Sequence, residues 1–322
     1  MTSLSLRPSL LEQGYELCEL CPRRCGVDRS SGKRGVCGQT SQLRIARAAL
    51  HFWEEPPISG EAGSGAIFFS GCPLRCVFCQ NHEISTGGFG KDISVERLSE
   101  IMLELQDQGA LNINLVTALH FAPHLCEAID RARSKGLRLP IVCNTSGYER
   151  HEIIHELEDY IDVWLCDFKY ASPKLAGELS QARDYPETAY QALGEMVEQL
   201  RRAGGRHCNS EGAMQRGIIV RHLVLPERIA DSLNVLDLIW EIGHNELDLS
   251  VMNQYTTNEQ CRTRSDGLER TLSKPEYEEV LDYADELGIT QLWWQESGTV
   301  SESFIPPFDL TGVDQSDIKA VN

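Results

Sequence analysis

The chain has 322 residues, of which 41% are hydrophobic, so it can bury one barrel-sized core and carry a small appendage. Its formal net charge of −18 matches a phosphate backbone poorly, and we therefore expect no nucleic-acid partner. The sequence contains no apolar run of about 18 residues and no basic start followed by an apolar leader, so we expect no membrane span, no secretion and a cytoplasmic location.

The first 65 residues contain a compact group of cysteines. The chain has twelve cysteines, and clustering without an export signal is typical of metal binding rather than of disulfides. Four thiolates fill the coordination of a zinc ion or of a closed iron–sulfur cluster, and the spacing does not decide between the two. Basic residues run through the same segment, and a solvated loop is the simplest interpretation of them. Balancing the thiolate charge and contacting an acidic partner are the alternatives. The four cysteines are Cys18, Cys21, Cys25 and Cys37.

A strand-like stretch at 43–52 and a linker-like stretch at 56–65 follow these cysteines. The linker-like stretch is rich in proline, glycine and serine, which are typical of turns and loops. We therefore expect residues 1–65 to form a small metal-binding extension that is joined by a linker to the main domain.

A second group of cysteines follows directly on the apolar run 66–70. It has the spacing C-x3-C-x2-C, with the cysteines Cys72, Cys76 and Cys79. An iron–sulfur cube has four irons and usually takes four thiolates, so three thiolates leave one iron open for chemistry. A zinc ion that takes a distant fourth ligand is the alternative.

From residue 66 to residue 296, apolar strand-like segments alternate with helix-like segments. This alternation predicts a parallel sheet whose outer face is covered by helices, either doubly wound or a full or partial barrel. Polar residues gather after most of the strands, which favours a partial (β/α)6-type barrel. A polar tail, 297–322, follows. We expect strands at 66–71, 112–117, 140–145, 161–168, 217–225, 247–255 and 291–295, and helices at 94–108, 122–135, 149–157, 186–203, 231–242 and 273–287.

The cysteine loop, with the aromatic Phe78 before its third cysteine, resembles the signature of the radical S-adenosylmethionine (SAM) superfamily. Other stretches are similar to the activating enzyme of pyruvate formate-lyase, and above all to the PflX-like orphan branch of that group. The stretches that carry the resemblance are 18–25, 51–60, 69–81, 144–148, 167–170 and 220–226.

The resemblance implies an oxidoreductase in which Cys72, Cys76 and Cys79 hold a [4Fe–4S] cluster whose open iron binds SAM. It implies reductive cleavage of SAM to a 5′-deoxyadenosyl radical that abstracts a hydrogen atom, with an electron donor such as flavodoxin or ferredoxin. The partner would be a protein substrate, a glycyl radical enzyme. Two alternatives stay open: modification of a small molecule or peptide, and a zinc-binding scaffold without catalysis.

Six further residues are candidates for SAM binding. Asp167 and Lys169 end one predicted strand and would meet the ammonium and carboxylate groups of SAM, or simply form an ion pair with each other. Arg221 lies inside an apolar strand pattern, where a buried arginine needs a partner such as the SAM carboxylate or a structural carboxylate. The six candidates are Phe78, Thr117, Asn144, Asp167, Lys169 and Arg221.

The sequence departs from the activating enzymes at 116–120. Those enzymes usually carry a Gly-Gly-Glu turn whose acid meets the SAM ammonium, whereas this chain has Val-Thr-Ala-Leu-His. Thr117 or His120 would have to replace that acid, although a histidine at a strand end also fits a purely structural role. Gln254 and Tyr255 follow a late strand and are candidates either for the pocket or for the core.

Overall fold

The computed structural model describes residues 9–295 and 305–314, so the expected tail 297–322 lies partly outside the described residues. The strands are β1 (Arg44–His51), β2 (Ser64–Phe69), β3 (Lys91–Asp92), β4 (Ile113–Val116), β5 (Ile141–Thr145), β6 (Val163–Asp167), β7 (His207–Cys208), β8 (Met214–Leu223), β9 (Asp248–Met252) and β10 (Leu292–Trp294). The helices are α1 (Leu10–Gln13), α2 (Pro56–Ser59), α3 (His82–Ser85), α4 (Val95–Asp107), α5 (Ala122–Ser134), α6 (His151–Glu156), α7 (Pro173–Ser180), α8 (Tyr185–Arg202), α9 (Ile229–Gly243), α10 (Glu259–Arg262) and α11 (Lys274–Glu286).

The strands form one main sheet with the order β10-β9-β8-β6-β5-β4-β2-β1-β3. The run from β2 to β10 is parallel, while β1 and β3 extend one edge in antiparallel fashion. The ends of this path do not pair within the described residues, which agrees with an open or partial barrel. The predicted α/β class with a mostly parallel sheet is confirmed.

Each predicted strand and helix of the main domain is present, with ends shifted by up to about three residues. Helix α7 was not predicted, although the capping residue Ser172 and Pro173 are typical of a helix start, because its eight residues are too few to show a clear apolar periodicity. The strand expected in the N-terminal extension is β1, and it pairs with β2 in the main sheet. The first 65 residues therefore contribute a strand to the main domain as well as the cysteine group.

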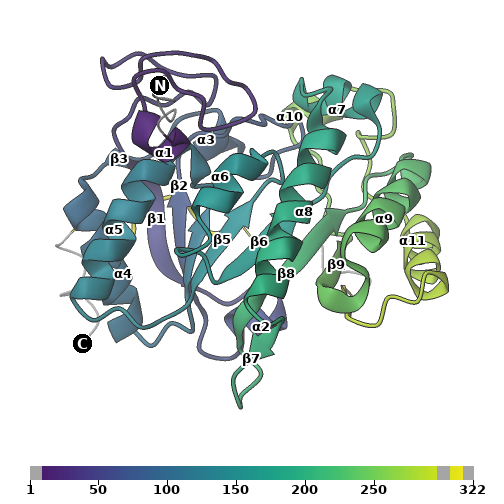
Figure 1. Cartoon of the computed structure of the whole chain (residues 1–322). Coiled ribbons are helices and arrows are strands. Elements are labelled where there is room, and N and C mark those ends of the chain that lie inside the picture. Colours follow the sequence, from purple (N-terminus) through teal and green to yellow (C-terminus); the bar gives the residue numbers. More distant parts are fainter. Residues whose placement is uncertain (1–8, 296–304, 315–322) are drawn as a thin grey trace, which may run out of the picture.

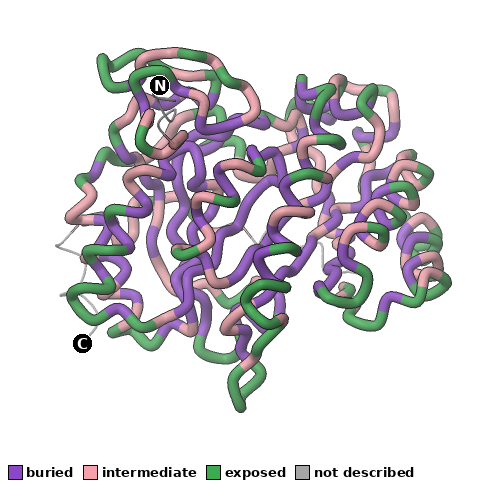
Figure 2. Tube along the Cα trace, viewed as in Figure 1, coloured by how far each residue is buried: buried purple, intermediate pink, exposed green. Residues whose placement is uncertain are grey.

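Alternation along the strands separates two faces of the sheet. Helices α4, α5, α6, α8, α9 and α11 lie along one face, and Figure 1 shows them in front of the strands. Ile58 of α2 packs against the other face, together with Val142, Leu165 and Ile219. Its segment was expected to be a linker, and this was wrong: Pro57, Ile58 and Ser59 are buried and close the inner side of the sheet. Figure 2 shows that burial is concentrated in the strands.

The described part of the C-terminal tail packs against the edge of the sheet. The Leu310 amide donates to the carbonyl of Ala46 at 3.0 Å, and the Ala48 amide donates to the carbonyl of Thr311 at 2.9 Å. Val313 is buried against the core, so an apolar anchor accompanies these backbone bonds. Residues 305–314 therefore cover part of the exposed edge of β1.

None of the helices in the described part of the chain has the length and hydropathy that a membrane-spanning helix requires.

Candidate active site

A cavity lies at the carboxyl ends of strands β2, β4, β5, β6, β8 and β9. It combines the cysteine loop with side chains that end several different strands, which is where sites form in parallel barrels. Residues from the segment after β1 and from the C-terminal segment complete its wall. The predicted site residues around it are Cys72, Cys76, Cys79, Phe78, Thr117, Asn144, Asp167, Lys169 and Arg221.

The three cysteines of the loop are free thiols that line this shared cavity. Burial, reinforced by the neighbouring Cys76, raises the pKa of Cys72 to about 12. Burial and Cys76 also raise the pKa of Cys79, although the Ser85 hydroxyl, which donates to its sulfur at 3.3 Å, opposes this. Buried thiols become stable thiolates when a metal binds them, so three thiols around one cavity fit a metal cluster.

Within residues 9–295 and 305–314, no three or more His, Cys, Asp or Glu side chains are arranged as ligands of a single metal ion. The fit to a cluster therefore rests on the donor chemistry and on the shared cavity. The loop itself is fixed on several sides, since the Val77 amide donates to the carbonyl of Leu179 at 2.8 Å and Asn258 donates to the carbonyl of Val77 at 2.7 Å.

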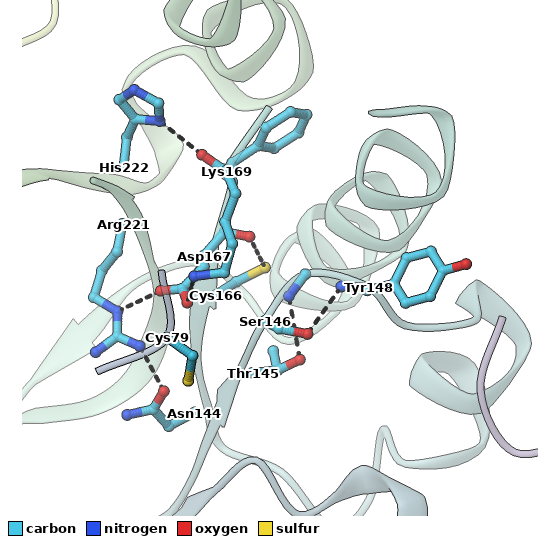
Figure 3. A network of polar contacts seen from close by, with 12 residues as sticks. Cys79, Asn144, Thr145, Ser146, Tyr148, Cys166, Asp167, Lys169, Arg221 and His222 are labelled. Carbon is cyan, nitrogen blue, oxygen red and sulfur yellow. Dashed lines mark hydrogen bonds and ion pairs between the residues drawn. The ribbon is translucent and has the colours of Figure 1, made fainter. Parts of the chain in front are cut away.

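A buried polar network lies beside the thiols. The Arg221 guanidinium contacts Asp167 through Nε at 2.9 Å and donates to Oδ1 of Asn144 from Nη2 at 2.5 Å. The Lys169 ammonium lies 2.6 Å from the second carboxylate oxygen of Asp167. Figure 3 shows Arg221, Asp167, Lys169 and Asn144 converging from neighbouring strands, with the Cys79 sulfur among them. In the structure, Asp167 thus forms ion pairs with both Arg221 and Lys169.

Glu54 belongs to this network and was not predicted. Its carboxylate lies 3.2 Å from Nη1 of Arg221 and accepts hydrogen bonds from Asn114 at 3.1 Å and Asn144 at 3.3 Å. The segment after β1 carries it onto the inner face of the sheet, at the same face as Ile58. The signal in the sequence was a pair of acids, Glu54 and Glu55, before two prolines, but reading the segment as a linker hid its role.

The pKa values of the acids in the network are shifted in opposite directions. Burial raises the pKa of Glu54 against the opposing charge of Arg221, and burial also raises the pKa of Glu55. Burial works against the ionised form of Asp167 too, but the charges of Arg221 and Lys169 outweigh it and hold its pKa below the usual range. Asp167 is therefore the carboxylate whose anionic form the neighbouring charges stabilise most clearly.

The turn after β4, at the position where the sequence departs from the activating enzymes, has a left-handed backbone conformation at Thr117. Thr117 has φ = +56°, and its amide donates to the carbonyl of Asn144 at 2.8 Å. A β-branched residue in the left-handed region is a strained conformation, of the kind that costs about 1–3 kcal/mol and occurs at functional sites. This turn directs Thr117 to the cavity wall.

His120 and Tyr255 do not line the cavity, whereas Gln254 does. His120 is buried, its Nε2 lies 3.0 Å from the carbonyl of Ser70, and burial lowers its pKa to about 3. Tyr255 is a core residue whose hydroxyl donates to the carbonyl of Leu268 at 2.6 Å. The structural interpretation of both residues is thus favoured over a role in binding.

The N-terminal cysteines lie in the turns that precede β1. Cys18, Cys21 and Cys37 are buried and Cys25 is half-buried, and all four are free thiols. The basic residues of this segment are not all solvated as expected, because Arg29 is only 1% exposed. This arginine lies inside the turns rather than on their surface.

Comparison with known proteins supports the assignment of the main domain. A model of the radical SAM superfamily matches residues 66–224, from β2 to the end of β8. An uncharacterised protein of Methanocaldococcus jannaschii is 26% identical over 298 residues, covering 90% of this chain and 80% of that protein.

Two solved structures of SuiB from Streptococcus suis also align with the chain. SuiB bound to the precursor peptide SuiA has a TM-score of 0.48 at 14% identity, over 70% of this chain and 47% of SuiB. SuiB bound to S-adenosylmethionine has a TM-score of 0.45 at 14% identity, over 70% of this chain and 45% of SuiB. The chain thus spans about half the length of these structures.

Proposed function

We propose that this chain, whose residues 66–224 match the radical SAM superfamily, is an enzyme that cleaves SAM at a [4Fe–4S] cluster held by Cys72, Cys76 and Cys79. The superfamily match supports SAM and the cluster as cofactors. The observation that carries the proposal is that three thiols of one loop and a buried network of acids and bases line the same cavity. A zinc ion in a non-catalytic scaffold, or an iron–sulfur cluster that only stores electrons, does not need a network of acids and bases beside its thiols.

Each part of the network suits one part of SAM. When bound, the cluster and SAM supply radical chemistry, in which one-electron cleavage of SAM leads to abstraction of a hydrogen atom. Arg221 and Lys169 would bind the carboxylate of SAM, while Asp167 and Glu54 would accept hydrogen bonds from its ammonium. In the structure these side chains pair with one another, so SAM would replace contacts that are already made.

A spectroscopic titration tests this proposal. Anaerobically reconstituted and reduced protein should show a paramagnetic cluster signal that changes when SAM is added. The change should be absent in Cys76→Ala and retained in Cys208→Ala, because Cys208 lies outside the cavity. Protein that takes up zinc but no iron, or a signal that SAM does not alter, would support the non-catalytic scaffold.

For the substrate, we propose a segment of a partner protein, as for the activating enzymes that the sequence resembles, with a glycyl radical enzyme as the specific target. The side chain of Trp53 supports this, because it lines the cavity and is also 58% exposed, and exposed aromatic residues are enriched at protein interfaces. A small molecule or a free peptide is the alternative.

Fractionation separates these substrates. Cell extract from the source organism is split by ultrafiltration into a high-mass and a low-mass fraction, and each is added to the reduced enzyme with SAM. Formation of 5′-deoxyadenosine should increase with the fraction above about 10 kDa and not with the low-mass fraction. Stimulation by the low-mass fraction alone would favour the small molecule or peptide.

Two further parts complete the proposal. The electron comes from a low-potential protein donor, such as flavodoxin or ferredoxin. A second metal, either zinc or an iron–sulfur cluster, binds at Cys18, Cys21, Cys25 and Cys37, where four thiols of a short segment supply a full ligand set.

A further inference from the structure

The N-terminal turns enclose a positive charge. Arg29 is 1% exposed, and its guanidinium lies over the rings of Tyr15 and Phe121, at 4.8 Å and 5.4 Å from their centroids. An arginine keeps its charge in a protein, so this is a buried cation. Its guanidinium donates to the carbonyls of Gln39 at 3.2 Å, Thr40 at 2.8 Å and His120 at 2.6 Å, and to the Cys18 sulfur at 3.5 Å.

Arg29 forms no ion pair with any carboxylate in the part of the chain that the structure describes. Carbonyl groups satisfy its N–H donors but carry no charge to balance the cation. Burying an uncompensated charge is costly, so such groups are paired in folded proteins. The groups beside Arg29 that can become anions are the thiols of Cys18 and Cys37 and the hydroxyl of Tyr15. Of these, the Cys18 sulfur accepts a hydrogen bond from the guanidinium, so the structure provides a counter-charge for a thiolate at this position.

Two other cysteines of the group, Cys25 and Cys37, have their sulfurs near Arg29. A Cβ atom built on Gly35 would lie 3.4 Å from the Cys25 sulfur, 3.5 Å from the Cys37 sulfur and 3.5 Å from Cδ of Arg29. A loop and a tight turn present these side chains. The Gly26 amide closes the loop by donating to the carbonyl of Cys18 at 3.0 Å, and the Gly38 amide closes the turn by donating to the carbonyl of Gly35 at 2.9 Å. The sulfurs of Cys25 and Cys37 thus lie near Gly35 and next to Arg29.

We infer that Arg29 is the internal counter-charge of a metal site in which Cys18, Cys21, Cys25 and Cys37 bind as thiolates. This deepens the second-metal part of the proposed function and does not depend on SAM chemistry. A zinc ion or a four-iron cube bound by four thiolates carries a net charge of about −2, and a buried guanidinium partly offsets it. The four side chains are not arranged as ligands of a single ion in the structure, so binding requires them to turn inward.

This metal site adjoins the loop of the radical cluster. Nε of Arg23, which lies between two of the four cysteines, donates to the carbonyl of Pro73 at 2.9 Å. A Cβ atom on Gly71 would lie 2.7 Å from the carbonyl oxygen of Cys37, so the two segments touch just before Cys72. The N-terminal segment that carries the four cysteines therefore packs directly against the loop of Cys72, Cys76 and Cys79.

The first test measures metal in a chain that lacks the radical cluster. The variant Cys72→Ala/Cys76→Ala/Cys79→Ala, purified without air, should retain either about one zinc or about four irons per chain, and elemental analysis distinguishes the two. Zinc and iron both at trace levels, after reconstitution with either metal, would overturn the site. Because this variant cannot cleave SAM, its metal content tests the N-terminal site independently of the proposed SAM chemistry.

The second test addresses Arg29 in the same background. Arg29→Met keeps the length of the side chain without its charge and should weaken metal affinity, measured by chelator competition, about tenfold or more. Arg29→Lys should recover most of that loss, and Arg97→Met, which removes an arginine of α4 outside both cysteine groups, should leave affinity unchanged. If Arg29→Met, Arg29→Lys and the protein with Arg29 unchanged bind the metal with equal affinity, Arg29 does not act as the counter-charge. If Arg29→Met does not fold, Arg29→Lys must retain the metal and Cys21→Ala/Cys25→Ala must lose it.

Discussion

At the scale of single residues, the site depends on charges that compensate one another inside the protein. Arg221 joins Asp167, Asn144 and Glu54, which come from three separate segments of the chain. A substitution that removes one partner leaves the others buried and unpaired, which is more costly than the loss of a surface ion pair. Effects on SAM binding must therefore be measured together with stability.

Arg221→Met and Asp167→Asn should each weaken SAM binding about 10–150-fold, because one charge-assisted contact in a partly buried site contributes roughly 1.5–3 kcal/mol. Calorimetric titration of reconstituted protein measures the affinity, and thermal unfolding shows whether the variant is folded. Arg202→Met removes an ion pair with Glu158 away from the cavity and serves as the control. Unchanged affinity in a folded Arg221 or Asp167 variant would remove that residue from the SAM site.

Much of the site could be predicted at this scale, for a physical reason. Asn144, Asp167 and Arg221 stand near the carboxyl ends of apolar strands, and parallel strands bring such ends to one edge of the sheet. Glu54 could not be placed in the same way, since it precedes the short helix α2 and reaches the site through the path of a loop. Arg29 was misjudged because a basic run usually lies in solvent, and the sequence does not show which member is enclosed.

At the scale of elements, the main strands and helices follow from hydrophobic periodicity, but the covering segments do not. The segment 53–63 and the C-terminal segment 305–314 have loop-like or polar composition, and yet both contribute to the cavity wall. Their burial depends on contacts with the sheet that no local pattern encodes. Ile58 and Val313 are isolated apolar anchors in such segments, each too short to show periodicity.

Gly312→Ala should detach the C-terminal segment from β1. Gly312 has φ = +72°, and a Cβ atom there would lie 2.0 Å from the carbonyl oxygen of Ala48, which no ordinary adjustment relieves. Hydrogen exchange should therefore become faster at the Ala48 amide, which donates to the carbonyl of Thr311. Gly288→Ala is the matched control, because Gly288 also has a positive φ but no atom near its added Cβ. Equal protection of Ala48 in the two variants would contradict this docking.

At the scale of the whole molecule, one buried acid links folding to pH. Burial raises the pKa of Glu149 to about 7 from an ordinary value of 4.5, against hydrogen bonds from Thr145 and Ser146. The folded protein therefore binds a proton that the unfolded chain releases between about pH 4.5 and pH 7. The contribution of Glu149 to the free energy of unfolding is therefore fully present below pH 4.5 and decreases as the pH rises to about 7. Above about pH 7 this contribution no longer changes.

Glu149→Gln removes this titration while keeping a similar shape. The free energy of unfolding of the variant, minus that of the unsubstituted protein, should rise between pH 4.5 and pH 7 by roughly 3 kcal/mol and then level off. Urea unfolding at several pH values gives this difference. A difference that stays constant from pH 4.5 to pH 8 would show that Glu149 is not held in its protonated form.

The most direct measurement of the central claim is formation of 5′-deoxyadenosine from SAM by the reduced, iron-loaded protein under anaerobic conditions. The account predicts that the unsubstituted protein and Cys208→Ala form this product together with methionine, and that Cys76→Ala does not, although it remains folded. No product from protein with a full complement of iron, or equal amounts of product with Cys76→Ala, would contradict the assignment of the cysteine loop as the site of SAM cleavage.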